Sequence, residues 1–130
     1  MSEMLVPVSP GETMDKITIL RIKAARMTDA TKVANVRREL EILERTWSES
    51  AYGNRDIAAD VAALQAVNER LWDIEDRIRD KERDKTFDAG FIELARSVYI
   101  ENDERAAIKK RINVTLGSTI VEEKSYAAYR

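Results

Sequence analysis

One long amphipathic helix, predicted from Asp56 to Lys85, most constrains what this chain can fold into. Apolar side chains recur in its sequence at spacings of four, three and four residues, which is the period of one helical face. These residues are Val67, Leu71, Ile74 and Ile78. Asn68, Glu75 and Glu82 follow one another at intervals of seven residues and form a polar row beside the apolar stripe. The other segments of this 130-residue chain are expected to pack against so long a helix.

The composition favours long helices with solvent-exposed flanks over a sheet protein. Charged residues make up 35% of the chain, against about 25% in ordinary proteins, and only four glycines and two prolines interrupt it. The 22 basic and 24 acidic residues leave a net charge of −2. Because no net positive field attracts nucleic acid, a nucleic-acid partner is not expected.

The absence of cysteine and histidine limits the chemistry open to this chain. It excludes disulfides, thiolate metal sites and cysteine nucleophiles, and it removes the usual general base near neutral pH. Any catalysis would have to use carboxylates, Lys, Arg, Tyr or hydroxyl groups, or a hard ion such as Mg²⁺ held by oxygen. We expect no cofactor and no bound metal. No stretch approaches the ~18 apolar residues of a membrane span, and the N-terminus has no basic region followed by an apolar one. We expect a cytoplasmic protein without membrane contact.

Local start and stop signals predict three further helices. Serine and aspartate side chains cap free backbone N–H groups, proline fits the first helical turn, and glycine ends helices. By these signals Ser9, Asp29 and Asp88 begin the helices, and Gly53 and Gly117 end two of them. With the long helix, the predicted elements cover about residues 10–27, 30–47, 56–85 and 89–116.

These elements predict one all-α domain over residues 1–130, a four-helix arrangement with a long antiparallel helical hairpin made by the last two helices. The apolar segment Met4–Val8 and the segment Ser118–Tyr126 are expected to be extended. They either pair with each other or pack across the helices. At 1.5 Å per residue the hairpin is about 40 Å long. It exposes apolar surface unless other helices or a second copy cover it, so we expect a homodimer.

Two polar residues, Asn102 and Arg105, fall on the apolar face of the last helix, where they can face the polar row of the long helix. One interpretation is that these groups satisfy one another and fix the register of the helices. The other is a pocket between helices in which arginines bind an anion and Glu75 orients it. The candidate ligand-binding residues are Arg38, Asn68, Glu75, Arg96, Asn102 and Arg105.

Two enzyme classes share part of this pattern. Lys32, Arg38, Glu39, Arg96 and Asn102 resemble residues of the all-helical chorismate mutases, which clamp a dicarboxylate between several helices. Acidic residues at spacings of three, four and seven resemble those with which all-helical nucleoside-triphosphate pyrophosphatases hold Mg²⁺. These acids are Glu39, Glu69, Asp73, Asp76 and Asp80. Three of them, Asp73, Asp76 and Asp80, have an Arg three or four positions away, which is typical of a salt-bridged surface helix.

Five motifs cover nearly the whole chain. They are Pro-Gly-Glu-x-x-Asp-Lys-Ile-Thr-Ile-Leu (10–20), Asn-Val-Arg-Arg-Glu-Leu (35–40), Asn-Glu-x-Leu-Trp-Asp-Ile-Glu-Asp-x-Ile-Arg (68–79), Phe-Ile-Glu-Leu-Ala-Arg-Ser-Val-Tyr (91–99) and Val-Glu-Glu-Lys-Ser-Tyr (121–126). Together they resemble an uncharacterised family of small bacterial and phage proteins. The resemblance implies one compact helical domain and brings no activity with it. It directs attention to Asp15, Asn35, Arg38, Asn68, Glu75, Arg96 and Asn102.

The function expected from these patterns is that of a non-catalytic helical protein that associates with itself or with a protein partner. Long apolar seams, balanced charge and the lack of His and Cys favour it. The alternative is a small helical enzyme or binding protein for an anionic metabolite, acting through Arg38, Arg96 and Arg105 with Glu75 orienting the ligand.

Overall fold

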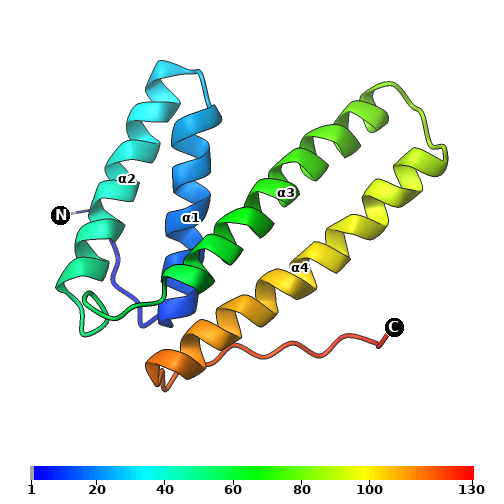
Figure 1. Ribbon diagram of the computed structural model, residues 1–130. Coiled ribbons are helices and arrows are strands. Elements are labelled where there is room, and N and C mark those ends of the chain that lie inside the picture. Colours follow the sequence, from blue (N-terminus) through cyan, green and yellow to red (C-terminus); the bar gives the residue numbers. More distant parts are fainter. Residues whose placement is uncertain (1) are drawn as a thin grey trace.

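Four α-helices joined by short loops make up the computed structural model, which describes residues 2–130 (Figure 1). No β-strand occurs among these residues, and the predicted all-α class is confirmed. The helices are α1 (Pro10–Arg26), α2 (Ala30–Glu49), α3 (Ala58–Arg83) and α4 (Ala89–Leu116).

The four helices form two hairpins that meet at one end and diverge toward the other (Figure 1). α1 packs against α2, α3 and α4, whereas within the described residues α2 contacts only α1. α3 and α4 lie side by side along their length, and their connecting turn projects away from the first hairpin. The base of the α3–α4 pair is therefore covered by α1, and its tip is not.

The helix limits follow from local capping chemistry. The side chains of Ser9, Asp29 and Asp88 accept hydrogen bonds from backbone N–H groups of the first turns of α1, α2 and α4. Gly117 ends α4 in the left-handed conformation, with φ of 70°. α3 begins at Ala58 without a side-chain cap at Ile57, slightly later than the sequence predicts.

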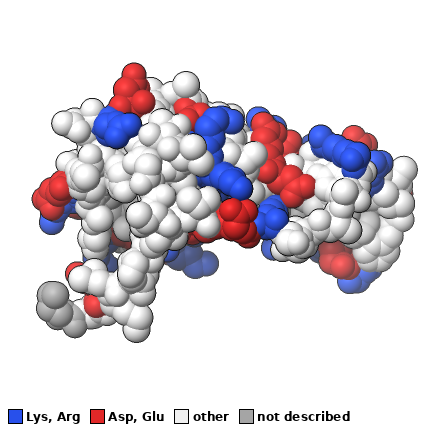
Figure 2. Space-filling view, turned by 90° about the horizontal axis from the view of Figure 1, so that it is seen from below, with Lys and Arg blue, Asp and Glu red and all other residues white. Residues whose placement is uncertain are grey.

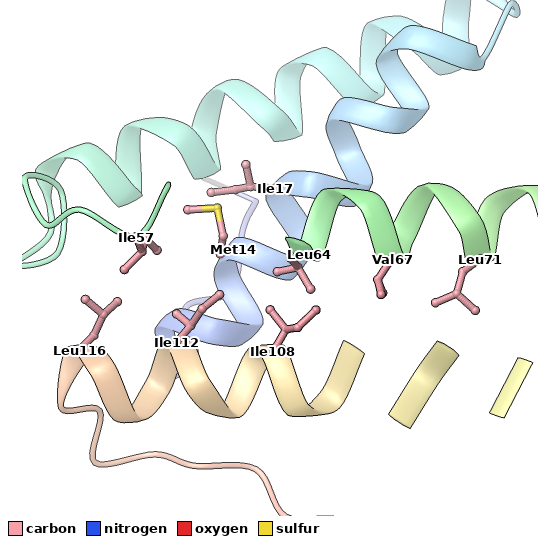
Figure 3. Close-up of a cluster of buried hydrophobic side chains, with 9 residues drawn as sticks. All are labelled: Met14, Ile17, Ile57, Leu64, Val67, Leu71, Ile108, Ile112 and Leu116. Atoms are coloured by element: carbon pink, nitrogen blue, oxygen red, sulfur yellow. The ribbon is translucent and has the colours of Figure 1, made fainter. Parts of the chain in front are cut away.

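The apolar core lies where α1 crosses the lower halves of α3 and α4 (Figure 3). Its members are Met14, Ile17, Ile57, Leu64, Val67, Leu71, Ile108, Ile112 and Leu116. The stripe predicted on the long helix is buried only in part. Val67 and Leu71 are buried, but Ile74 and Ile78 are half-buried because α1 does not cover this part of the hairpin.

The two ends of the chain form no strand pair in the part that the structure describes. Residues 2–8, here called the N-terminal arm, and residues 118–130, here called the C-terminal strap, are both irregular and extended. The strap runs along α4, which is the second of the two arrangements expected from the sequence (Figure 1).

Candidate functional site

One buried carboxylate joins three helices. Asp15 of α1 is fully buried and accepts a hydrogen bond from Nδ2 of Asn68 on α3 at 2.9 Å. It also accepts two hydrogen bonds from Arg105 on α4, one from Nε at 2.9 Å and one from Nη2. The planar guanidinium matches both carboxylate oxygens, which is the strongest form of this ion pair. Asp15 therefore fixes α1 against both helices of the second hairpin.

The groups around Asp15 complete a network in which each charge has a partner. Thr18 donates its hydroxyl to the carbonyl of Asp15 at 2.8 Å and accepts from Asn68 at 3.0 Å. Lys109 lies 3.8 Å from the Asp15 carboxylate and donates to Glu12. The hydrogen bond to Asp15 raises the pKa of Arg105, although burial opposes this. Within the described chain, every buried side-chain nitrogen and oxygen has a hydrogen-bond partner.

A second cluster ties the start of α1 to α4 and to the strap. The N–H of Gly11 donates to Oδ1 of Asn113 at 2.7 Å, and Nδ2 of Asn113 donates to Glu122 at 2.9 Å. The hydroxyl of Ser9 donates to the other oxygen of Glu122. A Cβ at Gly11 would lie 2.5 Å from the backbone oxygen of Lys109, so only glycine allows this close approach.

A hollow of about 370 Å³ lies beside the network, between α1, α3 and α4. Apolar side chains form its walls, amide and guanidinium groups line its inner part, and four charged side chains stand at its rim. The lining residues are Ile19, Ile22, Lys23, Asn68, Leu71, Trp72, Glu75, Asp76, Arg79, Asn102 and Arg105. We call this hollow the interhelical groove.

Four of the six residues predicted for a ligand site line the interhelical groove: Asn68, Glu75, Asn102 and Arg105. Asn68 and Arg105 meet on Asp15, and Arg105 also donates to Asn102 at 3.5 Å. The carboxylate of Glu75 accepts from Arg79, one turn further along α3.

The other two predicted residues, Arg38 and Arg96, lie elsewhere. Arg38 is exposed on α2 and donates to Asn35 in the same helix, and α2 contacts only α1 within the described residues. Arg96 is exposed on α4, nine positions before Arg105. At 3.6 residues per turn this separation places the two side chains on opposite sides of the helix.

Sequence reasoning gave Asp15 no partner, and it overlooked Thr18 and Lys109. The sequence of α1 does indicate that Asp15 and Thr18 point inward, because Asp15, Thr18 and Ile22 follow one another at spacings of three and four. All three are buried, so the row marks a second inner face of this helix. Its partners come from α3 and α4, and no local spacing identifies them.

The acids compared with a magnesium site are spread over the surface. Asp73 pairs with Arg26, Asp80 with Arg83 at 3.2 Å, and Glu39 lies 3.9 Å from Lys16. No three acidic side chains of the described chain come together in a way that would hold a metal ion.

The comparison with known families matches residues 4–129 to a family of unknown function, DUF6165. The chain belongs to this family. The description of DUF6165 assigns no activity to its members. No curated protein and no solved structure matches the chain. Among residues 2–130, no helix combines the length and the apolar character needed to cross a membrane.

The strap is held on α4 mainly by exposed polar contacts. Asp103 accepts from Nζ of Lys124 at 2.8 Å and from the hydroxyl of Tyr129, and these two bonds lower the pKa of Asp103. The ring of Tyr129 packs edge-on against Tyr99 with 5.0 Å between centroids. Burial opposes ionisation of Glu122, but the bonds from Ser9 and Asn113 and the charge of Lys109 outweigh it and lower the pKa of Glu122.

These contacts predict that the strap loosens in acid. Because the folded pKa of Glu122 lies below its ordinary value of 4.5, its contribution to stability is present above that pH and lost as the pH falls through the folded pKa. Because Glu122 is exposed and water screens its contacts, we expect Glu122→Gln to lower the free energy of unfolding by only about 1 kcal/mol at pH 7. The difference is expected to shrink as the pH falls below 4.5.

Urea unfolding of both proteins between pH 3 and pH 7 measures this difference. Glu123→Gln is the matched control, because Glu123 makes only an exposed ion pair with Lys110, at 3.2 Å. An equal pH dependence in wild type and Glu122→Gln would contradict the assignment.

Proposed function

We propose that this protein is a non-catalytic helical interaction protein that self-associates as a homodimer. The N-terminal arm carries the proposal. Met4 and Leu5 are 85% and 89% exposed, and Val6 and Val8 are 60% and 50% exposed. Contiguous exposed apolar side chains of this kind mark interaction surfaces in folded proteins.

Two further features support self-association. The face seen in Figure 2 has a broad uncharged area beside the projecting arm, with Lys, Arg, Asp and Glu at its edges and farther along the molecule. The tip of the α3–α4 hairpin also exposes apolar groups, with Phe87 at 55% and Ile92 at 57%. A second copy would remove such surface from water, which is the main driving force of association.

The network around Asp15 supports a structural role for Asn68 and Arg105. The buried atoms of these groups all have hydrogen-bond partners, and Asp15 is the acceptor that both share. A catalytic acid, base or nucleophile instead needs a proton or electron pair directed toward a substrate. We therefore assign Asn68, Asn102 and Arg105 to helix register. The proposal keeps the bacterial origin and the cytoplasmic location that the sequence predicts.

Sedimentation equilibrium tests the proposed dimer. We expect a species of about twice the 14.9 kDa chain mass at tens of micromolar protein, dissociating on dilution, and a Tm that rises with protein concentration. A mass of 14.9 kDa that stays constant over the whole concentration range would refute self-association.

A second candidate function is the binding of a small carboxylate or phosphate in the interhelical groove. The observation that favours it is the convergence of Lys23, Asn102 and Arg105 around one hollow with Trp72 in its wall. Guanidinium, ammonium and amide N–H groups are donors that such anions accept. Arg38 and Arg96 take no part in this candidate.

A thermal-shift titration with inorganic phosphate, succinate and glucose 6-phosphate tests the groove. A ligand at 100 times its Kd adds about 2.7 kcal/mol to the free energy of unfolding, which raises Tm by several degrees. We expect Lys23→Met to reduce the shift and Lys32→Met, an exposed change on α2, to leave it intact. Flat titrations with all three compounds would eliminate this candidate.

A further inference from the structure

A second hollow region lies between α4 and the strap. It consists of two adjoining cavities of about 530 Å³ each. Val98 and Ala106 of α4 and Tyr126 and Ala127 of the strap line it with apolar groups, and charged side chains such as Asp103 and Lys124 also border it. We call this region the strap cleft.

The strap offers an unused hydrogen-bonding edge beside this cleft. No backbone N–H or C=O of residues 121–130 bonds to another backbone group in the described chain. The strap is extended and exposed over this length, and side chains alone hold it to α4. An open extended edge is a template for pairing with a further strand.

The N-terminal arm has complementary properties. Its residues are extended, their backbone groups make no backbone hydrogen bonds in the described chain, and most of its side chains are apolar and exposed. In an extended strand Met4, Val6 and Val8 share one face and one hydrogen-bonding edge, and Leu5 and Pro7 share the other. Because Pro7 lacks an N–H, the edge of Met4, Val6 and Val8 is the one that suits pairing.

Two prolines direct the arm away from its own strap. Val6 precedes Pro7 and Ser9 precedes Pro10, and a residue before proline is restricted to extended conformations. Ser9 has φ of −76° and ψ of 155° and is fixed by its bonds to Glu12 and Glu122. Folding back onto the same strap would need a reversal within these few stiff residues, and the arm instead projects from the body (Figure 2).

We propose that the N-terminal arm of one copy pairs with the C-terminal strap of a second copy and fills its strap cleft. The side chains of Met4, Val6 and Val8 enter the cleft, and Leu5 faces outward. Two-fold symmetry makes the exchange reciprocal, so each dimer contains two arm–strap pairs. This inference rests on the proposed self-association and specifies the surface that mediates it.

A matched pair of substitutions tests the orientation of the arm. We expect Val6→Asp to raise the dimer dissociation constant at least 100-fold, because it places a charge in the cleft. We expect Leu5→Asp, with the same charge on the adjacent outward residue, to change it less than about threefold. Sedimentation velocity gives both constants, and circular dichroism verifies that both variants are folded. Equal weakening by the two substitutions would overturn the assigned face.

Cysteine cross-linking tests the partner of the arm, since the native chain contains no cysteine. Val6→Cys mixed with Ala127→Cys is expected to give a disulfide-linked heterodimer on mild oxidation. The control mixture of Val6→Cys with Arg83→Cys, at the far end of α3, is expected to give little. Equal yields in the two mixtures, or an intrachain disulfide in the Val6→Cys/Ala127→Cys double variant, would overturn exchange between copies.

Deleting residues 2–8 separates failure of this inference from failure of the proposed function. A dimeric wild type that becomes monomeric on deletion supports both. A wild type that stays dimeric after deletion refutes the arm–strap exchange and leaves self-association standing. A monomeric wild type refutes self-association and the exchange together.

Discussion

The buried ion pair between Asp15 and Arg105 is the interaction on which the remaining structure depends. Removing a carboxylate and a guanidinium from water costs several kcal/mol each, and only close pairing with further hydrogen bonds offsets this. Asn68, on a third helix, supplies one such bond to Asp15. α1 can therefore lie on the α3–α4 pair only in the position that brings these three side chains together. Apolar contacts such as those of Leu64 and Ile112 add most of the favourable free energy but are less selective.

The same constraint explains which surfaces remain open. Because α1 is fixed at the base of the α3–α4 hairpin, the core forms there. Within the described chain, no further helix covers the tip of this hairpin or the outer face of α2. The hydrogen bond from Ser9 to Glu122, next to the network, holds the end of the arm against the first part of the strap. The arm and the strap thus leave the body as two extended segments whose backbones are unpaired.

The sequence predicts features that depend on local chemistry and fails where distant segments must meet. The helix limits at Ser9, Asp29, Asp88 and Gly117 were predicted because a cap involves only neighbouring residues. Asn68 was also visible, in a polar row beside an apolar stripe, and Arg105 was visible as an interruption of an apolar period. Their common partner, Asp15, was not, because it lies 53 and 90 positions away on α1. The separation of Arg38 from the groove follows in the same way from α2 contacting only α1.

A double-mutant cycle on Asp15 and Arg105 tests the central role of this pair most directly. The free energies of unfolding of wild type, Asp15→Ala, Arg105→Ala and the double variant are measured in urea at pH 7. Arg105→Ala leaves the fully buried Asp15 carboxylate without its guanidinium, so we expect a loss of about 3–5 kcal/mol. Asp15→Ala leaves Arg105, whose side chain is 30% exposed and can turn to water, so we expect a smaller loss of about 2–3 kcal/mol. The double variant is expected to lose little more than Arg105→Ala alone. The resulting coupling energy is about 2–3 kcal/mol. Additive losses, with a coupling energy below about 0.5 kcal/mol, would contradict the account.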